Sequence, residues 1–406
     1  MNVMFTVQGD GRGHMTQAIA LKEMLEQSGH RVVAVLAGQN QSRTLPSFFT
    51  EAFQVPVEPF SSPGFTLKHG KAISTLRSVL HFFGNVRAYS RSLAAIQTAI
   101  DRSRPDLVLN FLEPLAGYFN LRHRPKVPVL SVAHHFMFEH PRYPKVHKFG
   151  VQALGMRFYV RLTGANASRL ALSFYPGEDL PGRRLFVCPP VLRRQLFELR
   201  PDPNGKYLLV YLLNHGYETE IEAWHRQHAE VPIHCFYDKP GAPPEERRTP
   251  NLTFHALHGE KYLRLMAGCL GVVCTAGFES ISEAAYLGKR LLMVPVQNHP
   301  EQTVNALDAQ LAGLGVHDTG FRLSRLLEST DAKASASFKQ WVDQAGAVAV
   351  RAAEITAARG AWKPATKPKA ELPKSRKQAE IRGARSLPGL GLGFRAGLRG
   401  EEKSES

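Results

Sequence analysis

The chain has 406 residues, a formal net charge of +16 and four cysteines. This length accommodates two domains, and no apolar run approaches the roughly 18 to 20 residues that span a membrane. The cysteines show neither a CxxC pair nor a His-flanked spacing, so we expect buried, reduced thiols and no metal site. The sequence begins directly with a strand and has no basic leader, which predicts a cytoplasmic location without a signal peptide.

The positive charge is distributed unevenly along the chain. Residues 1–200 carry +13, residues 201–362 carry −3 and residues 363–406 carry +6. A basic N-terminal half suits peripheral contact with an anionic surface, such as the inner face of a membrane, or with a phosphate-bearing acceptor. Charge that only keeps the protein soluble explains the same numbers, and both interpretations stay open. Nucleic-acid binding is not expected, because no aromatic-basic sheet motif accompanies the charge.

The N-terminal half reads as strands alternating with helices. The predicted strands are residues 2–8, 31–37, 104–110, 127–135, 170–176 and 184–191. The predicted helices are residues 15–28, residues 71–103 with an interruption near 83–84, and residues 147–163. The last of these combines Phe and Tyr with Lys and Arg, a composition that suits the headgroup layer of a membrane, while burial in the core is the alternative.

A glycine-rich loop, GDGRGH, connects the first predicted strand to the first helix. Its glycines do not fit the dinucleotide fingerprint, and the second strand ends without an acidic residue, so no nicotinamide or flavin cofactor is expected. The loop also lacks the Lys-Ser/Thr of a P-loop. It is a tight turn, with Gly11 and Gly13, that presents Asp10 and His14 at the edge of the sheet. His14 has a pKa suited to taking a proton from a hydroxyl, although a purely structural histidine is the alternative.

Two later strands of this half also end in polar side chains. Glu113 follows the strand that ends at Asn110, and His134 and His135 end the next strand. Because the carboxyl ends of parallel strands share one edge of a sheet, we expect these side chains near His14. Asp10 and Glu113 are therefore alternative catalytic bases.

The segment LRPDPNGK, residues 199–206, is the predicted domain boundary. A second set of strands and helices follows over residues 205–360. Its predicted strands are residues 207–214, 232–238 and 252–257, and its predicted helices are residues 217–229, 259–268 and 332–358. Residues 363–406 lack periodicity and are predicted to be a disordered, basic tail.

Residues 272–306 are the most informative part of the chain. An apolar strand, a Gly turn, an amphipathic helix, a second strand and a polar loop predict a parallel βαβ unit. The turn at Gly277 opens a helix whose free N–H groups favour phosphate. Glu283 lies one turn further, where a carboxylate can accept hydrogen bonds from ribose hydroxyls. Glu301 and Gln302, in the polar loop, can do the same for a sugar.

This segment resembles the nucleotide-sugar site of GT-B-fold glycosyltransferases, the MurG-like and UDP-glucuronosyltransferase-like group. The residues that carry the resemblance are Gly277, Ser280, Glu283, Pro295, Glu301, Gln302 and Asn305. The first strand, the glycine-rich loop with its His and the first helix also match, and the resemblance covers most of residues 1–360. It implies two tandem Rossmann-like domains that face each other across a cleft. Residues 1–200 would bind the acceptor, residues 205–360 would bind the donor, and the last helix would cross back onto the first domain.

The resemblance implies transfer of a sugar from a nucleotide sugar, in this group a UDP-sugar, to an acceptor hydroxyl, with inversion. The donor residues would be Asn214, Gly216, Gly277, Phe278, Glu279, Ser280, Glu283, Glu301 and Gln302. The acceptor side would comprise Gly11, Gly13, His134 and His135. The acceptor would be a small molecule or a lipid. No cofactor is expected, and the lack of a DxD-type pair agrees with independence from metal.

Two other functions stay open at this point. A UDP-sugar epimerase shares this fold, although it usually needs several carboxylates around the sugar and the predicted loops offer few. The second is a non-catalytic protein that binds sugar nucleotides or polyanions, against which the combination of His14, Glu283 and Glu301 argues.

Overall fold

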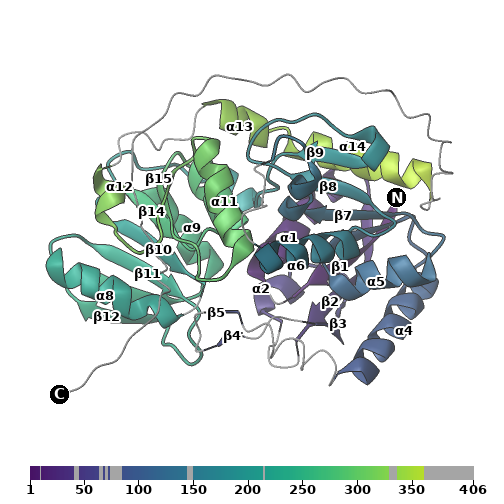
Figure 1. Ribbon diagram of the computed structural model, residues 1–406, viewed down its shortest axis with the longest axis horizontal. Helices are drawn as coiled ribbons and strands as arrows, with labels where there is room; N and C mark the ends of the chain where they lie inside the picture. The colour runs from purple at the N-terminus through teal and green to yellow at the C-terminus, as the bar shows by residue number, and fades with distance from the viewer. Residues whose placement is uncertain are drawn as a thin grey trace, which may run out of the picture. The chain divides into compact units, whose positions relative to one another are not determined.

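The computed structural model describes residues 1–9, 11–40, 45–63, 67–68, 72–73, 85–143, 150–213, 215–328 and 336–360. Two seven-stranded sheets organise this part of the chain, one from each half of the sequence (Figure 1). In the sequence, the strands of the first sheet precede residues 199–206 and those of the second sheet follow them. The predicted fold class of two tandem Rossmann-like α/β units is confirmed, whereas the predicted tail at residues 363–406 lies outside the described residues.

The N-terminal sheet is parallel, with the strand order β3-β2-β1-β6-β7-β8-β9. Its strands are β1 (Asn2–Gln8), β2 (Arg31–Gln39), β3 (Val57–Ser61), β6 (Leu107–Phe111), β7 (Val129–Ala133), β8 (Ser168–Leu172) and β9 (Leu185–Cys188). Every residue of β6 and β7 is buried, because helices cover both faces of the sheet. This burial on two sides explains why the strands read as apolar runs rather than as alternating patterns.

Helices in this half follow the prediction only in part. They are α1 (Arg12–Gln27), α2 (Ser47–Thr50), α4 (Val86–Ser103), α5 (Pro114–His123), α6 (Gly150–Thr163) and α7 (Arg194–Phe197), with 3₁₀ turns η1 (His134–Glu139) and η3 (Pro181–Arg183). The predicted helix at 71–103 was too long, since Ala72–Ile73 form a small strand, β5, that pairs with β4 (Leu67–Lys68). Helix α5 was not predicted.

The C-terminal sheet has the order β12-β13-β11-β10-β14-β15-β16. Its strands are β10 (Leu208–Leu212), β11 (Ile233–Tyr237), β12 (Glu245–Thr249), β13 (Leu252–Ala256), β14 (Gly271–Cys274), β15 (Arg290–Met293) and β16 (Val316–His317). Only β12 runs antiparallel to its neighbour in this sheet. Its sequence, Glu-Glu-Arg-Arg-Thr, has no apolar periodicity, and its charges suit an edge strand. For this reason the sequence did not predict it.

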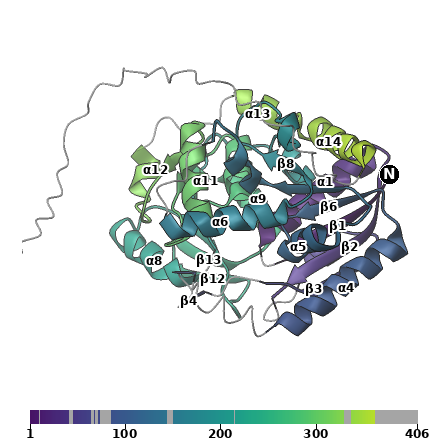
Figure 2. The same cartoon turned by 45° about the vertical axis from the view of Figure 1, so that its right-hand side comes forward.

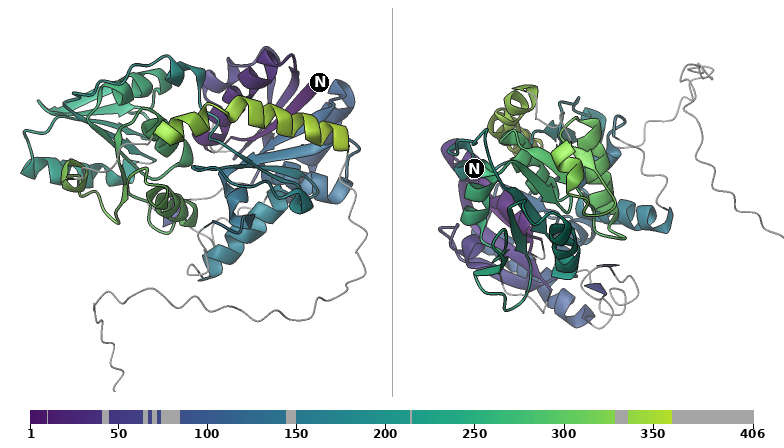
Figure 3. Two further views of the ribbon diagram at one scale, coloured as in Figure 1. Left: turned by 90° about the horizontal axis from the view of Figure 1, so that it is seen from above. Right: turned by 90° about the vertical axis from the view of Figure 1, so that its left-hand side faces the viewer.

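The remaining elements are η4 (His215–Tyr217), α8 (Glu218–Gln227), α9 (Gly259–Gly268), α10 (Phe278–Tyr286), α11 (Pro300–Leu311), α12 (Ser324–Glu328), α13 (Ala336–Val342) and α14 (Ala345–Arg359). Helix α13 packs on α10, and α14 then packs on α1 and on strands β6 to β9 of the N-terminal sheet (Figure 3). The last helix thus crosses back to the first half, as expected. A hydrogen bond also joins α13 to the first half, since the indole Nε1 of Trp341 donates to the carbonyl of Ser173 at 3.0 Å.

One apolar cluster connects the two halves. It includes Val3 and Leu21 from the first half, Cys274 and Ile281 from the second, and Ala349 of α14. This shared core holds the start of α1 close to the start of α10. Among the described residues, no helix is both long and apolar enough to cross a membrane.

Candidate active site

The glycine-rich loop places the start of α1 against α10. The N–H of Gly9 donates to the carbonyl of Gly38 at 2.8 Å, and a Cβ at Gly9 would lie 2.7 Å from that oxygen, so only glycine fits. Gly11 precedes α1 as its N-cap. A Cβ at Gly13 would lie 3.4 Å from Cγ of Glu279, which shows how closely the two helices approach. Asp10 lies outside the described residues.

His14 occupies this junction on the first turn of α1. Its Nδ1 lies 3.3 Å from Oε1 of Gln17, and Nε2 of Gln17 donates to Oε1 of Glu279 at 2.7 Å. Burial, reinforced by the neighbouring His135, lowers the pKa of His14 to about 4. The imidazole is therefore neutral at physiological pH, the protonation state in which it can accept a proton.

His135 and Glu301 lie next to each other beside His14. Nε2 of His135 lies 3.3 Å from Oε2 of Glu301, and the rings of His14 and His135 are 6.3 Å apart. Burial alone would raise the pKa of Glu301, but His135, His299 and His14 together outweigh it and lower that pKa. Glu301 is thus an anion among three histidines, at the N-terminus of α11.

His134, by contrast, is packed as a core residue. Its Nδ1 lies 2.6 Å from the carbonyl of Leu172, and its Nε2 lies 3.2 Å from the hydroxyl of Tyr143. The ring stacks on Phe278 with a centroid distance of 4.2 Å. Burial lowers the pKa of His134 to about 3. Both nitrogens have protein partners, so this position favours a structural role over the predicted acceptor role, and Phe278 likewise packs in the core.

Glu113 also has a structural role. It is fully buried as the N-cap of α5, where its Oε2 accepts from the N–H of Ala116 at 2.6 Å and its Oε1 accepts from the hydroxyl of Ser62. Asn110 holds the same turn, since its Oδ1 accepts from the N–H of Glu113 at 2.9 Å. With both carboxylate oxygens engaged, Glu113 is placed as a helix cap, and the geometry does not support its predicted role as an alternative base.

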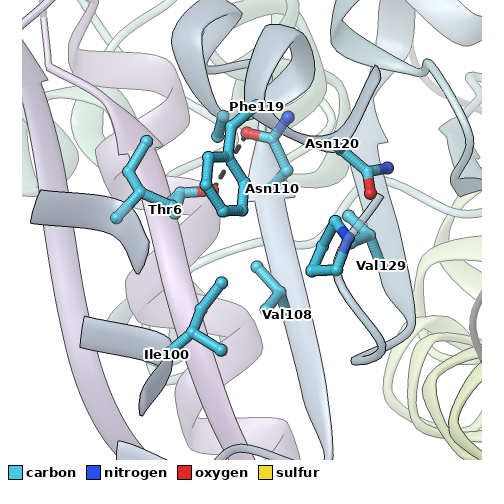
Figure 4. A pocket seen from close by; sticks show the side chains of 10 residues that line it. Thr6, Ile100, Val108, Asn110, Phe119, Asn120 and Val129 are labelled. Atoms are coloured by element: carbon cyan, nitrogen blue, oxygen red, sulfur yellow. Dashed lines mark hydrogen bonds between the residues drawn. The ribbon is translucent and has the colours of Figure 1, made fainter. Parts of the chain in front are cut away.

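A small cavity adjoins Asn110 (Figure 4). The hydroxyl of Thr6 donates to Oδ1 of Asn110 at 3.2 Å on its wall, and Phe119 and Asn120 also line it. Its volume is about 10 Å³, which matches a single water molecule and excludes a sugar or a nucleotide. The cavity therefore belongs to the packing beneath α5.

The turn before α10 combines a strained residue with a glycine at the N-cap. Ala276 has a φ of 57°, a left-handed conformation that is strained for a residue with a Cβ, and Nδ2 of Asn305 donates to its carbonyl at 3.1 Å. Gly277 is the N-cap, and in the described structure no atom lies within 4 Å of where its Cβ would be. The side of Gly277 that a Cβ would occupy therefore borders open space, and Ser280 is only partly buried on the first turn.

Glu283 is buried one turn further along α10 and has an unexpected partner. Nε and Nη2 of Arg193 donate to its Oε1 at 2.8 Å and 2.5 Å. Arg193 precedes α7 and belongs to the first half of the chain. Neither Arg193 nor Gln17 is predicted from the sequence, because their partners lie 90 and 262 residues away along the chain.

The loop after β15 lies at the C-terminal ends of the strands of the second sheet, next to the turn before α10. Oε1 of Gln302 accepts from the N–H of Val296 at 2.8 Å, so this amide shapes the loop. Gly216 lies in η4, whose Tyr217 hydroxyl accepts from the N–H of Gln297 at 3.1 Å. Asn214 lies outside the described residues.

The structure thus gathers His14, His135, Glu279 and Glu301 around the junction of α1, α10 and α11, and their predicted roles remain predictions. In the described ranges, no cluster of three His, Cys, Asp or Glu side chains is arranged for a metal ion.

Comparisons with known proteins place this arrangement in a family. A family model described as glycosyl transferase family 1 matches residues 1–326, and no curated protein matches. The solved glycotransferase of kitacinnamycin shares 16% identity at a TM-score of 0.59, covering 87% of this chain and 97% of that one. UGT89C1 of Arabidopsis thaliana, complexed with UDP, shares 14% identity at a TM-score of 0.57, covering 88% of this chain and 99% of that one.

The calicheamicin glycosyltransferase CalG4 shares 18% identity at a TM-score of 0.55, covering 88% of this chain and 98% of its own. At these identities the solved structures show a common fold, and the resemblance to GT-B-fold glycosyltransferases is confirmed. Because the family model covers well over half of the sequence, this protein belongs to glycosyl transferase family 1.

Proposed function

We propose that this glycosyltransferase transfers a sugar from a UDP-sugar to an acceptor hydroxyl held beside His14. One observation carries the proposal. The neutral His14 of the first half is linked through Gln17 to Glu279, on the helix whose N-cap, Gly277, has open space where a Cβ would lie. A proton acceptor and a phosphate-suited helix therefore meet at one place. The neighbour UGT89C1 was solved with UDP, which supports a uridine-based donor.

The reaction follows from this arrangement. His14 takes the proton of the acceptor hydroxyl while the hydroxyl oxygen forms a bond to the anomeric carbon of the sugar. The bond from that carbon to the diphosphate breaks, and its electron pair leaves with UDP. The N–H groups and the dipole of α10 stabilise the charge on the departing diphosphate, so the proposed mechanism requires no metal ion. Attack from the face opposite the diphosphate inverts the anomeric centre.

The acceptor side adds a feature that favours a membrane lipid. Helix α6 lies at the front of the molecule in Figure 2. Its Leu154 and Phe158 are 65% and 68% exposed, and Arg157 and Arg161 share their face of the helix. Exposed apolar side chains flanked by arginines fit an anionic lipid surface. Helix α6 packs on α11, whose first turn carries Glu301. The hydroxyl of Tyr159 on α6 donates to the carbonyl of Leu112, just after β6.

This geometry refines the sequence-based prediction for the helix. Tyr159 points inward, Lys148 and Phe149 lie outside the described residues, and Leu154 joins Phe158 at the surface. We therefore include peripheral attachment to the inner face of a membrane in the proposal, with a lipid as the preferred acceptor and a small soluble molecule as the alternative.

Incubation with a panel of UDP-sugars tests the catalytic proposal. A glycosyltransferase releases UDP slowly even without acceptor and faster when vesicles containing lipid hydroxyl groups are added. Interconversion of the sugars without release of UDP would identify an epimerase instead. Binding without either reaction would identify a non-catalytic protein and overturn the proposal.

A further inference from the structure

Gln17 is a buried amide that links the two halves of the site. It lies one turn after His14 on α1 and is 2% exposed. Its Oε1 faces Nδ1 of His14 at 3.3 Å, and its Nε2 faces Oε1 of Glu279 at 2.7 Å. A side-chain amide has one end that only donates and one end that only accepts, so its orientation determines what each neighbour must do.

The carboxyl group of Glu279 determines this orientation. Its Oε2 is buried without a hydrogen-bond partner among the described residues, so a proton on this carboxyl group belongs to Oε2 and Oε1 stays an acceptor. Oε1 accepts from Nε2 of Gln17, so Gln17 turns its NH₂ group toward α10 and its oxygen toward His14. An amide oxygen cannot donate, and the hydrogen of the second bond must therefore belong to Nδ1 of His14. A neutral imidazole carries one N–H, which leaves Nε2 with a lone pair.

We propose that Gln17 and Glu279 are positioning residues that hold His14 in its Nδ1–H tautomer, with Nε2 as the atom that takes the acceptor's proton. This inference rests on the proposed function and adds the atom at which the base acts. Glu279 lies in the first turn of α10, so the same hydrogen-bond chain connects the base to the helix that borders the donor space. Gln17 thereby takes the orienting role that a carboxylate has in a catalytic triad.

The groups around His14 keep its ring neutral, so the tautomer decides whether the ring can accept a proton. Burial and His135 keep the pKa of His14 far below neutrality, so the ring carries a single proton throughout the working range. The other groups that act on the ring are Glu301, which raises this pKa, and Gln17 itself. With the proton on Nε2 instead, the ring would present a donor to the acceptor hydroxyl and could not receive its proton.

Long-range ¹H–¹⁵N NMR of the full chain measures this tautomer without any substrate. The His14 signals are identified by their loss in His14→Gln. In the wild-type protein we expect Nδ1 to have the shift of a protonated nitrogen and Nε2 that of a bare one. Glu279→Gln keeps an acceptor for Gln17 and should preserve this pattern, whereas Glu279→Leu and Gln17→Leu should lose it. An Nε2–H tautomer in the wild-type protein would overturn the inference.

Kinetics provide a second, independent test. Gln17→Leu should lower kcat by about 10- to 100-fold while the donor KM and the affinity for UDP stay unchanged, because only the base is disturbed. Gln17→Glu restores an acceptor for Nδ1–H and should recover turnover. Its negative charge raises the pKa of His14, so the acid limb of the kcat profile should move to higher pH.

The outcomes separate the two proposals. Normal turnover by a folded Gln17→Leu variant would contradict the positioning role and leave glycosyl transfer intact. A wild-type protein that releases no UDP from any donor would contradict the proposed function, while the tautomer could still be measured. Retained UDP binding shows that a variant is folded.

Discussion

At the scale of single residues, the contacts between the two halves determine what each site residue is able to do. Glu283, proposed to bind the ribose, is already oriented by the two hydrogen bonds from Arg193. A charge-assisted pair of this kind fixes the direction of a carboxylate that would otherwise rotate. The orientation of Glu283 therefore depends on Arg193, a residue of the first half.

Replacing Glu283 by Ala should weaken UDP binding by about 1–3 kcal/mol, since a ribose hydroxyl would lose its acceptor. Calorimetric titration with UDP measures this change. Glu354→Ala is a matched control, because that carboxylate lies on α14 and pairs with His30 at 3.2 Å. If Glu283→Ala bound UDP as tightly as the control, Glu283 would have no place in the donor site.

Glu279 gives donor binding a dependence on pH. Burial raises the pKa of Glu279 to about 8, Glu283 adds to the rise, and Gln17 and Arg193 oppose it. A diphosphate beside the start of α10 favours the neutral carboxyl group, because the ionised form would place two anions together. Affinity for UDP should therefore be highest below that pKa and fall as pH rises through it.

Titration of UDP binding from neutral to alkaline pH tests this prediction. Glu279→Gln cannot ionise and should lose the decline, while the titration of UDP itself contributes equally to both proteins. The same decline in both would show that another group is responsible.

At the scale of elements, three strained residues lie in turns that follow strands. Leu112, Ala276 and Asn298 have φ values of 54°, 57° and 58° and follow β6, β14 and β15. Each is a residue with a Cβ in a left-handed conformation, which persists only where the surroundings determine it. These turns aim the starts of α5, α10 and the loop before α11, and only the last two border the proposed site.

Helix α6 is expected to attach the protein to anionic membranes. Each basic residue near such a surface contributes about 1 kcal/mol, so Arg157 and Arg161 with the exposed Leu154 and Phe158 should give reversible binding. Flotation with phosphatidylglycerol vesicles should recover the wild-type protein at low salt, and about 0.5 M salt should release it.

The variant Leu154→Ala/Phe158→Ala should lose this binding. Phe197→Ala, which removes a 41% exposed side chain on α7, should not. Equal recovery with neutral and anionic vesicles, or flotation unaffected by the double substitution, would exclude α6 as an attachment surface and favour a soluble acceptor.

The sequence predicted elements well where apolar periodicity was strong. The predicted strand at residues 2–8 and the predicted helix at 259–268 match β1 and α9. The charged edge strand β12 could not be found in this way, because antiparallel pairing at an edge requires no apolar pattern. A position at the end of a strand did not by itself predict a site residue. Glu113 and His134 both follow strands, yet their side chains are buried and hydrogen-bond to the backbone.

At the scale of the whole molecule, the site depends on contacts that no local pattern reveals. Gln17 with Glu279, and Arg193 with Glu283, each join distant parts of the sequence. Helix α14 packs on the N-terminal sheet, and together with the shared apolar core it holds these partners next to each other. A family member can therefore be recognised from its strands and loops, whereas the orientation of its base requires the folded chain.

In the proposed reaction, His14 takes the acceptor's proton while the second half of the chain holds the donor. The most direct measurement compares release of UDP from a UDP-sugar by the wild-type protein and by His14→Gln, with UDP affinity determined for both. We expect turnover to fall about 100-fold or more with UDP affinity nearly unchanged, the scale of a lost general base. Normal turnover by His14→Gln, or an equal loss of UDP affinity, would contradict the account.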